Sequence, residues 1–519
     1  MTKSTKYDII KMICKAFAFP LGYNNRFLWF YYTDFYDFVP ILFGQKSRFS
    51  KNIFIFPGQN LYFCGKSIGF DPYGGFFMKK TLVLLLALTF ALLCFSGCSE
   101  RSLLNPKNPV TLTLWHTYGE QADSPMNRLV SEFNKTIGKE KGIVISVKLM
   151  SSAGKIGGQL AEAQSGAPGA LDMPDLFFCH NSDAAKLGAE NLLNWNDYFT
   201  DEERAGFVSD FLADGMIDER LVIFPVSKST HVLYISKREF SRFAAATGAT
   251  YSDLATWDGF FRTAEKYYEY SGKPFCAFDY VQRAVELNAI EKGAKPDDLY
   301  KDGYYDFDNA TLKASYMQFA KALAKGHIMI AELYSNTHVM TGDVPCGAGS
   351  SAAVMYYNDT VTYPDNTSEP LDLKILPLPQ NENCPKYATQ AGVGLCAYRT
   401  TNQKAEAASV FAHWLTDGER NLSFVAETGY MPVRNDAYQS LKSYSFRKES
   451  YKELYSALTE IRNTQTFLRE PSFVGYYDKV NTLYAELRRA QTTMPERVKN
   501  GESADALAGE LWELFSSAK

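Results

Sequence analysis

Hydrophobic residues alternate with polar ones in some stretches of the chain and recur every three or four positions in others. Alternation over 110–115 (VTLTLW) and Ile143–Leu149 (IVISVKL), and a short apolar run over 175–179 (DLFFC), predict three strands. Helical spacing lies between and after these strands. The segments expected to form helices are 125–133, 156–164, 181–190, 405–417, 476–487 and 507–515.

The order strand, helix, strand, helix, strand at the start of this region is typical of an α/β domain. It predicts a parallel sheet with right-handed crossover helices. A single core rarely extends past about 250–300 residues, so the 519-residue chain is expected to contain at least two lobes. The helix over 405–417 is expected to bury one apolar side, made of Ala407, Val410, Phe411, Trp414 and Leu415.

The first 77 residues have a different character. Phe, Tyr and Trp make up 22 of them, and 27–38 (FLWFYYTDFYDF) is nearly continuous aromatic sequence. This segment shows neither a helical nor a strand period. A membrane-associated extension is one interpretation. The preferred one is that translation starts at Met78, so that 1–77 is an untranslated or non-native extension, since Gly74-Gly75 is what a ribosome-binding site would encode.

From Met78 onward the sequence predicts export. Two lysines, an uncharged apolar stretch over 81–95 and small residues before Cys98 form a signal peptide over 78–97. The apolar run is shorter than a membrane-spanning helix needs, and Phe-Ser-Gly-Cys resembles the lipobox of bacterial lipoproteins. Lipidation of Cys98 is expected to anchor the protein to the outer face of the cell membrane, with a tether over 98–109. Cleavage to a free secreted product is the alternative.

The charge balance narrows the classes of partner. The whole chain has a formal net charge of −4 and a pI of about 6.0. The segment 81–519 holds 43 Lys or Arg against 54 Asp or Glu, which is a net charge of −11. Nucleic-acid binders usually present a basic face, so no nucleic-acid partner is expected.

The spacing of the cysteines and the lack of a catalytic motif both argue against an enzyme. The sparse cysteines beyond Cys98 are Cys179, Cys276, Cys346, Cys384 and Cys396. Their spacing fits neither a zinc site nor a dense disulfide framework; one long-range disulfide is possible and cannot be assigned. The sequence contains no phosphate-binding glycine loop, nucleophile elbow or zinc-protease motif. We therefore expect a protein that is not an enzyme and has no metal and no cofactor.

Five sequence blocks carry a family resemblance. They are an opening strand and helix over 112–134, PDLFFC over 174–179, a first crossing over 224–236, TWDGFF over 256–261, and a return crossing over 392–434 ending in ETGYMPVR. These blocks resemble those of extracellular solute-binding proteins of ABC importers, family 1, the maltose and glycerol-3-phosphate-binding type. Their order and spacing both match, and the resemblance covers 110–519.

The resemblance implies a two-lobed periplasmic-binding-protein-like fold of type II, in the α/β class. Its ligand would lie in a cleft between the lobes and be enclosed by hinge closure. The N-terminal lobe is expected to hold 110–228 plus 388–430. The C-terminal lobe is expected to hold 229–387 plus 431–519.

The same resemblance implies ligand-contacting residues in several segments. They are Trp115, His116 and Tyr118 after the first strand; His180, Asn181 and Ser182 after the third; Ser227, Ser229 and Thr230 in the first crossing; Gly349, Ser350 and Ser351 in a small-residue loop; and Gly392, Tyr430 and Arg469 later in the chain. Their alternative roles are rim packing, capping of hinge turns, a simple turn, a buried hinge tyrosine and a surface arginine. Tyr430 is the strongest candidate, because a phenol can both stack on a sugar and form a hydrogen bond.

The sequence therefore predicts a lipid-anchored monomer that captures a polar solute, a sugar or oligosaccharide, and delivers it to the permease subunits of an ABC transporter. Glycerol-3-phosphate or a glycerophosphodiester is the second ligand class, although Asn181 stands where the glycerol-phosphate binders carry Glu. Three alternatives from other classes remain. They are a glycan-degrading surface lipoprotein enzyme, a sensor subunit that partners a histidine kinase, and a purely structural lipoprotein.

Overall fold

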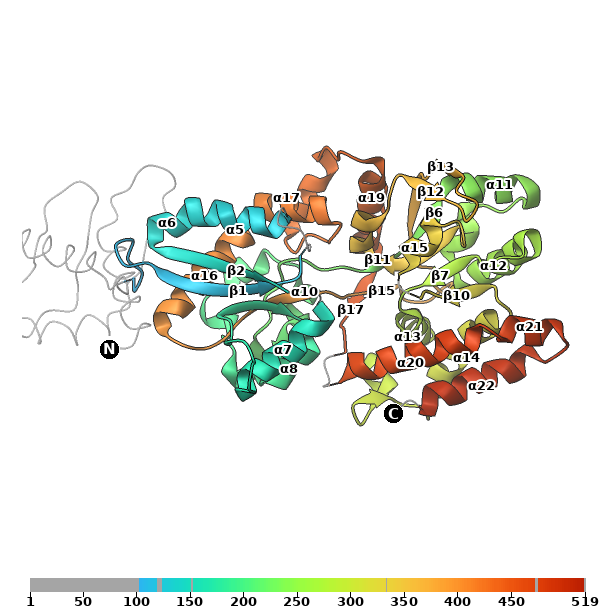
Figure 1. Cartoon of the computed structure of the whole chain (residues 1–519), viewed down its shortest axis with the longest axis horizontal. Helices are drawn as coiled ribbons and strands as arrows, with labels where there is room; N and C mark the ends of the chain where they lie inside the picture. The colour runs from blue at the N-terminus through green and yellow to red at the C-terminus, as the bar shows by residue number, and fades with distance from the viewer. Residues whose placement is uncertain (1–101, 119–123, 151–152, 333, 472–474, 518–519) are drawn as a thin grey trace, which may run out of the picture. The chain divides into compact units, whose positions relative to one another are not determined.

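The computed structural model describes residues 102–118, 124–150, 153–332, 334–471 and 475–517, which belong to one unit running from Ser99 to Lys519 (Figure 1). The extension over 1–77, the signal peptide and Cys98 lie outside these residues. Two central sheets organise the described part of the chain. Each sheet carries its own helices, and we call the two assemblies the first and second lobe.

The three predicted strands form the first sheet together with a fourth strand, β16, in the order β16–β3–β1–β2. β1 (Val110–His116) lies parallel to β2 (Ile143–Leu149) and to β3 (Leu176–Cys179). The fourth strand, β16 (Gly394–Ala397), lies antiparallel to β3. The sheet is therefore mixed rather than wholly parallel, because β16 starts beside the carboxyl end of β3 and runs the opposite way.

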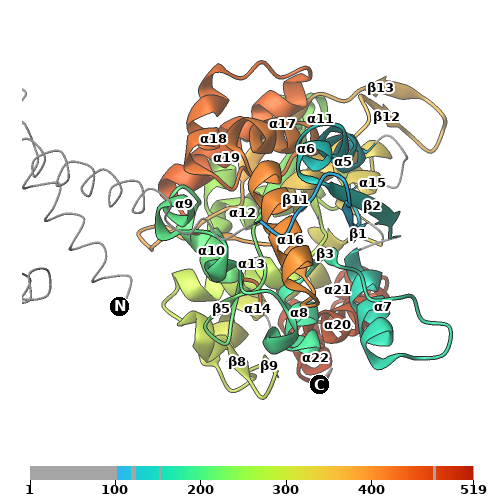
Figure 2. The ribbon, with the colours of Figure 1, turned by 90° about the vertical axis from the view of Figure 1, so that its left-hand side faces the viewer.

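Helices cover both faces of the first sheet. Figures 1 and 2 show α5 (Pro125–Lys135) and α6 (Ile137–Lys141) on one side of β1 and β2, and α7 (Ala153–Ser165) and α8 (Asn181–Leu187) on the other. The side chain of Ser124 accepts a hydrogen bond from the Asn127 N–H (3.1 Å) and caps the start of α5. α8 ends earlier than predicted, because Gly188 at its end adopts a φ of 85°.

The helix predicted over 405–417 is α16 (Asn402–Leu415), which contacts β1. Ala407, Phe411, Trp414 and Leu415 are buried and Val410 packs against the core, as the helical spacing predicts. The remaining elements between α8 and β6 are short. They are η1 (Ala189–Asn191), η2 (Trp195–Asp197), α9 (Asp201–Ala205), α10 (Ser209–Asp214), β4 (Met216–Ile217) and β5 (Arg220–Leu221). α16 is followed in the chain by α17 (Gly418–Thr428), α18 (Asn435–Ser440) and η6 (Leu441–Ser443).

The second sheet has the order β10–β7–β11–β6–β14. β10 (Ile328–Ile330), β7 (Cys276–Phe278) and β11 (Cys346–Ser350) are parallel, while β6 (His231–Ser236) is antiparallel to both β11 and β14 (Leu373–Pro377). Its helices are α11 (Lys237–Thr247), α12 (Trp257–Ser271), α13 (Val281–Glu291), α14 (Ala310–Ala324), α15 (Ser335–Met340), α19 (Glu449–Thr464), α20 (Tyr476–Gln491), α21 (Met494–Lys499) and α22 (Ala504–Ser517). Shorter elements are η3 (Tyr251–Ala255), η4 (Pro296–Leu299), η5 (Ser351–Tyr356), β8 (Tyr300–Lys301), β9 (Tyr304–Tyr305), β12 (Thr360–Thr362) and β13 (Ser368–Pro370).

Aromatic side chains fill much of the core of the second lobe. Tyr316 of α14 stacks on Phe515 of α22 with ring centroids 4.6 Å apart, and Trp512 meets both rings edge-on. Full burial of one large apolar side chain stabilises a fold by about 1.5–3 kcal/mol. The final helix, predicted over 507–515, therefore belongs to the core of this lobe.

The chain crosses between the sheets through paired backbone segments, which form the hinge. Ser229 and Ala391 exchange two backbone hydrogen bonds (2.9 and 3.0 Å). β15 (Tyr387–Thr389) pairs in parallel with β17 (Thr466–Leu468). The Val208 N–H donates to the Val433 carbonyl (2.9 Å), so we propose that the first lobe continues past 430 through α18. The other lobe limits stay a prediction.

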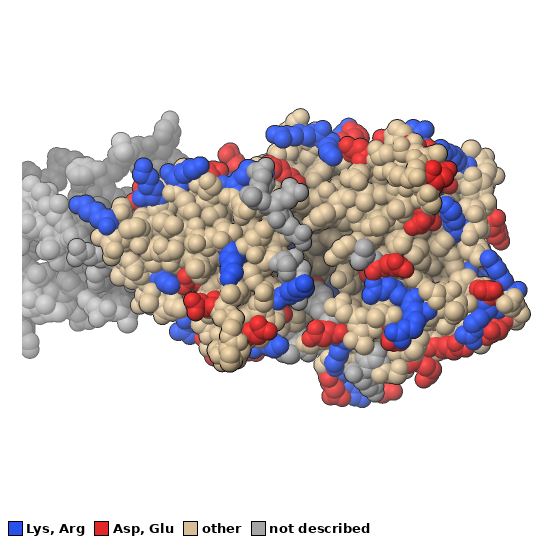
Figure 3. All heavy atoms as spheres, in the orientation of Figure 1, with Lys and Arg blue, Asp and Glu red and all other residues tan. Residues whose placement is uncertain are grey.

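Charged side chains of both signs are intermixed on the face of the described residues that Figure 3 shows. Several form surface ion pairs. Arg497, for example, pairs with both Glu502 and Glu510 (2.7 Å each). Much of the surface charge is therefore compensated locally.

Candidate ligand-binding site

The carboxyl ends of strands in both sheets lie beside the hinge. In the second sheet, His231 begins β6 just after the first crossing and pairs with Ser350, the last residue of β11. In the first sheet, Gly394 begins β16 after the return crossing and pairs with Cys179, the last residue of β3. Open α/β sheets bind ligands outside the carboxyl ends of their strands. The residues after these strand ends are therefore the candidate site.

Tyr118 connects the end of β1 to the first crossing. Its phenol oxygen lies 3.0 Å from Ser227 Oγ, and its ring meets the ring of Tyr430 edge-on at 5.7 Å. Its backbone N–H donates to His116 Nδ1 (3.2 Å), so the proton of this imidazole sits on Nε2, which faces Asn127 Oδ1 at 2.9 Å. Burial lowers the pKa of His116 despite that bond. A neutral His116 thus holds the backbone of Tyr118 in place by accepting its N–H.

Trp115 lies inside the strand rather than at a rim after it. β1 continues through His116, and Trp115 is only 2% exposed. Its side chain belongs to a core cluster with Ile156 and Leu160 of α7. This placement fits the packing role for Trp115, and we leave it out of the proposed contacts.

A buried charged cluster lies where β3 meets the hinge. Lys228 Nζ is 2.6 Å from Asp214 Oδ2 and both side chains are 1% exposed, while His180 Nδ1 is 3.2 Å from Glu470 Oε2. The Glu470 N–H donates to Asp214 Oδ1 (3.3 Å), and Asn181 Nδ2 donates to the Asp214 carbonyl (2.6 Å). His180 and Asn181 are therefore joined to a cluster whose charged members the sequence analysis missed. The neighbouring Ser182 is buried at the start of α8.

The ion pair of His180 predicts a pH dependence. Burial lowers the pKa of His180, but the Glu470 carboxylate outweighs burial and raises it overall; Asp183 adds to the rise and Lys228 opposes it. A raised folded pKa means that protonated His180 stabilises the fold fully below about pH 6.5 and loses this effect as pH rises through the folded pKa. In urea unfolding, the stability difference between wild type and His180→Asn should therefore shrink from about pH 6 to about pH 9. A difference that stays constant or grows would contradict this. The depressed pKa of His231, about 3, has the opposite sign and cancels in the difference.

Other predicted residues of the hinge are held by contacts with the neighbouring crossing segment. Thr230 Oγ1 lies 3.2 Å from Thr389 Oγ1, and Ser229 is held by its two backbone bonds to Ala391. Gly392 has a φ of 111°, and an added Cβ would meet the Ser229 nitrogen only at 3.7 Å. The backbone conformation of Gly392, rather than lack of space, is what requires glycine.

The small residues predicted to form a loop lie where β11 ends, with Gly349 and Ser350 as the last two residues of the strand and Ser351 as the first residue of η5. Ser350 Oγ accepts the Ala352 N–H (3.2 Å), and the carbonyls of Ser350 and Ser351 accept hydrogen bonds from the Tyr234 hydroxyl (2.8 and 2.7 Å). Ser351 is fully buried, and its hydroxyl has no hydrogen-bond partner among the described residues. The capping role of Ser350 is thus visible, while the Ser351 hydroxyl is available to a ligand only if η5 moves.

Three tyrosines missed by the sequence analysis lie in segments that follow strands of the second sheet, and Tyr430, which follows α17, lies near one of them. Tyr280 follows β7, Tyr334 follows β10, and Tyr356 ends η5, which follows β11. Tyr334 and Tyr356 are 63% and 62% exposed. Burial and the nearby Tyr356 raise the pKa of Tyr430 to about 12, and burial and the nearby Tyr334 raise that of Tyr280 to about 12. We call Tyr280, Tyr334, Tyr356 and Tyr430 the tyrosine face.

A carboxyl group lies at the base of this face. Asp279 Oδ1 accepts the Ser335 N–H (2.5 Å), and burial raises the pKa of Asp279 to about 7. A Cβ on Gly349 would lie 2.3 Å from Asp279 Oδ2, so a side chain at 349 would displace the carboxyl group. Gly349, predicted as part of a ligand loop, thus makes room for Asp279. The signal in the sequence that could have identified Asp279 is that it directly follows a buried strand ending at Phe278 and precedes Tyr280.

Two buried cations near the hinge have carboxylate partners. Arg283 is buried and pairs with Glu286, as Lys228 pairs with Asp214. Arg469 is exposed, and its carbonyl accepts from Arg283 Nη2 (3.5 Å). Arg469 is therefore a surface residue next to the buried Glu470.

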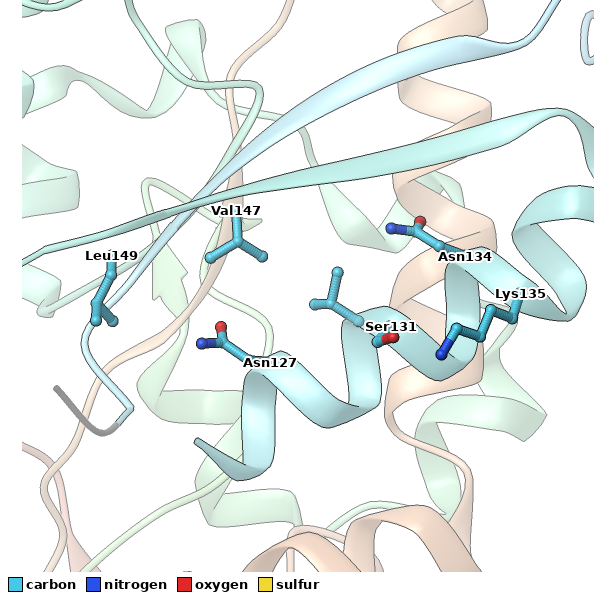
Figure 4. A pocket seen from close by; sticks show the side chains of 7 residues that line it. Asn127, Ser131, Asn134, Lys135, Val147 and Leu149 are labelled. Carbon is cyan, nitrogen blue, oxygen red and sulfur yellow. The ribbon is translucent and has the colours of Figure 1, made fainter. Parts of the chain in front are cut away.

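A groove of about 660 Å³ lies elsewhere, between α5 and the edge strand β2 (Figure 4). It is lined by Asn127, Val130, Ser131, Asn134, Lys135, Val147 and Leu149. The Asn134 side chain bonds to both the N–H and the carbonyl of Ile145 on the strand edge (2.8 Å each). The groove is lined by none of the predicted site residues, so we do not assign the site to it.

No helix among the described residues has the length and apolar character that crossing a membrane requires. Nor do three or more His, Cys, Asp or Glu side chains come together there in a way that could hold a metal ion.

Comparison with known proteins gives a family and a fold. The family model of bacterial extracellular solute-binding proteins matches residues 128–449. No curated protein sequence matches significantly. Among solved structures, the cyclic α-maltosyl-1,6-maltose binding protein from Arthrobacter globiformis is similar at 15% identity and a TM-score of 0.60, with 79% of this chain and 99% of that chain covered.

Two more solved structures have comparable similarity. An ABC substrate-binding protein from Listeria monocytogenes in complex with cycloalternan matches at 12% identity and a TM-score of 0.59, covering 79% of this chain and 99% of that one. UgpB from Mycobacterium tuberculosis in complex with glycerophosphocholine matches at 16% identity and a TM-score of 0.55, covering 79% and 98%. Identities this low establish the two-lobed fold and leave the ligand open.

Proposed function

The chain belongs to the family of bacterial extracellular solute-binding proteins, and from this premise we propose that it captures a neutral oligosaccharide at the tyrosine face. The observation that carries the proposal is the exposure of Tyr334 and Tyr356, each above 60%, in the segments that follow β10 and β11, the two strands that flank β7 in the second sheet. Exposed tyrosine rings offer flat apolar faces for stacking on sugar rings, together with hydroxyls for hydrogen bonds.

The polar groups around the tyrosine face suit hydroxyl groups better than a charge. Lys228 and Arg283 are buried in pairs with carboxylates, so a bound anion would compete with those partners. Asp279, whose pKa is about 7, can accept a hydrogen bond from a sugar hydroxyl or donate one when protonated. Tyr430 remains the first-lobe contact that we propose, because it lies close enough to the exposed Tyr356 for that residue to raise its pKa.

A glycerophosphodiester is the second candidate ligand. Arg469 is exposed at the end of the hinge strand β17, and a guanidinium can bind a phosphate through two hydrogen bonds. The fold of this chain resembles the glycerophosphocholine-bound protein from Mycobacterium tuberculosis about as closely as it resembles the oligosaccharide-binding proteins, which supports this candidate. The opposing observation is the carboxylate of Glu470, the next residue along the chain.

Thermal unfolding with a ligand panel separates the two candidates. A bound ligand at 100 times its Kd adds about 2.7 kcal/mol to stability and raises the Tm. We expect linear and cyclic gluco-oligosaccharides to raise the Tm, while glycerol-3-phosphate and glycerophosphocholine leave it unchanged. A rise with the phosphates alone would support the second candidate, and no rise with any oligosaccharide would refute the first.

The remaining steps of the transport role are also proposals. We propose that Cys98 carries the lipid anchor, that the protein acts as a monomer without catalytic activity, and that it passes its ligand to ABC permease subunits. Cys98 lies outside the described residues, so the anchor is supported by the signal sequence over 78–97. Membership of an extracellular family agrees with this location.

A further inference from the structure

Four of the five cysteines in the described residues lie in pairs on neighbouring strands. In the first sheet, Cys179 Sγ of β3 is 3.7 Å from Cys396 Sγ of β16, and both residues are fully buried. The antiparallel register sets Cys179 opposite Gly394 and Cys396 opposite Phe177. The two cysteines are therefore diagonal neighbours on one face of the sheet.

The second sheet repeats the arrangement. Cys276 of β7 is directly opposite Cys346 of β11 in the parallel register, and both are fully buried. Adjacent strands lie about 4.8 Å apart, inside the Cα separation of about 4.4–6.8 Å that a disulfide spans. Burial and a hydrogen bond with Cys346 raise the pKa of the Cys276 thiol. The fifth cysteine, Cys384, is partly exposed on the segment that leads to β15.

We propose that both pairs are disulfide-forming sites, Cys179 with Cys396 in the first lobe and Cys276 with Cys346 in the second, with Cys384 left as a thiol. All five are thiols in the structure. The oxidant is a disulfide compound of the extracellular space, which suits an exported protein. In each pair, two S–H bonds break and one S–S bond forms, while the oxidant takes up the two electrons and two protons and becomes two thiols.

The first-lobe disulfide would join two parts of the chain that are distant in sequence. Cys179 and Cys396 are 217 residues apart, and the whole second sheet lies between them in the chain. It would fasten β16, which enters after the return crossing, to the strands made before the first crossing. A cross-link that closes so long a loop restricts the unfolded chain strongly. Because both sulfurs are buried in the folded protein, reductants would reach the bond mainly after local unfolding.

Peptide mapping tests the assignment directly. The full chain is folded in a buffer of oxidised and reduced glutathione, quenched in acid, denatured, alkylated and digested without reduction. We expect one peptide pair joined through Cys179 and Cys396, one joined through Cys276 and Cys346, and alkylated Cys384. Alkylation of both members of a pair would overturn the proposal for that lobe, and linkage of Cys384 to any other cysteine would overturn the pairing.

A thermal measurement tests the consequence. Reduction during unfolding should lower the Tm of the oxidised wild type by roughly 5–10 °C. A Cys179→Ala/Cys396→Ala variant should lose part of this response, and the matched single variant Cys384→Ala should keep all of it. An equal response of wild type and the double variant would overturn the first-lobe disulfide. Neither measurement uses a ligand, so the outcome is independent of the proposed function.

Discussion

Replacing Asp214 with alanine is expected to lower the free energy of unfolding by about 3–5 kcal/mol, the cost of leaving one partner of a buried ion pair uncompensated. Asp214 Oδ2 is 2.6 Å from Lys228 Nζ, and both side chains are 1% exposed. Without the carboxylate, the buried Lys228 side chain would lose its ion-pair partner in a site closed to water. Urea unfolding of Asp214→Ala at pH 7 measures the loss.

Two further variants separate the charge effect from lost packing. A double variant, Asp214→Leu with Lys228→Met, removes both charges and should regain most of the stability. It should not regain all of it, because Asp214 Oδ1 also accepts the Glu470 N–H (3.3 Å). Asp201→Ala is the matched control, because Asp201 is 98% exposed and pairs with Arg204 at the surface. It should cost no more than about 1 kcal/mol. A loss in Asp214→Ala no larger than in Asp201→Ala would contradict the expectation.

Much of the fold could be predicted from local periodicity. The alternation over Ile143–Leu149 gives the bounds of β2 as observed, and helical spacing located α5, α7, α16, α20 and α22. β16 was not predicted, because its four residues, GLCA, are all buried and show no period. Its direction could not be predicted either, since that depends on which side of the hinge the chain re-enters the first sheet.

The candidate site was predicted less well, because exposure and partnership are properties of the assembled fold. Trp115 was expected to meet a ligand and is buried, whereas Tyr334 and Tyr356 were not singled out and are exposed. The chain has 33 tyrosines, and nothing local distinguishes these two from the rest. Only the parallel order of β10, β7 and β11 brings their strand ends together.

The hinge explains why several predicted contacts have structural partners. Ser227 faces Tyr118, Thr230 faces Thr389, and His180 faces Glu470. These contacts join strand ends to crossing segments, so a ligand that reaches them would also act on the hinge. Differential contacts of this kind are what allow a ligand to shift a protein between conformations.

Removing either exposed ring of the tyrosine face is expected to weaken oligosaccharide binding by about 10- to 100-fold. Tyrosines that anchor an interface commonly contribute 2 kcal/mol or more, and about 1.4 kcal/mol corresponds to a tenfold change in Kd. Tyr334→Ala and Tyr356→Ala should each show this loss in calorimetry with the oligosaccharide that raises the Tm most. Their stability should stay within about 0.5 kcal/mol of wild type, because both side chains are more than 60% exposed.

The comparison with other tyrosine variants identifies the interaction. Tyr270→Ala is the matched control, because Tyr270 is 43% exposed on α12, within a helix rather than after a strand end. Its affinity should equal that of wild type. Tyr334→Phe keeps the ring and loses only the hydroxyl, so it should retain most of the affinity if stacking dominates. Unchanged affinity in both Tyr334→Ala and Tyr356→Ala would remove the tyrosine face from the site. A loss in Tyr334→Phe as large as in Tyr334→Ala would instead assign the contact to the hydroxyl, because the ring that phenylalanine keeps would then contribute nothing to the affinity.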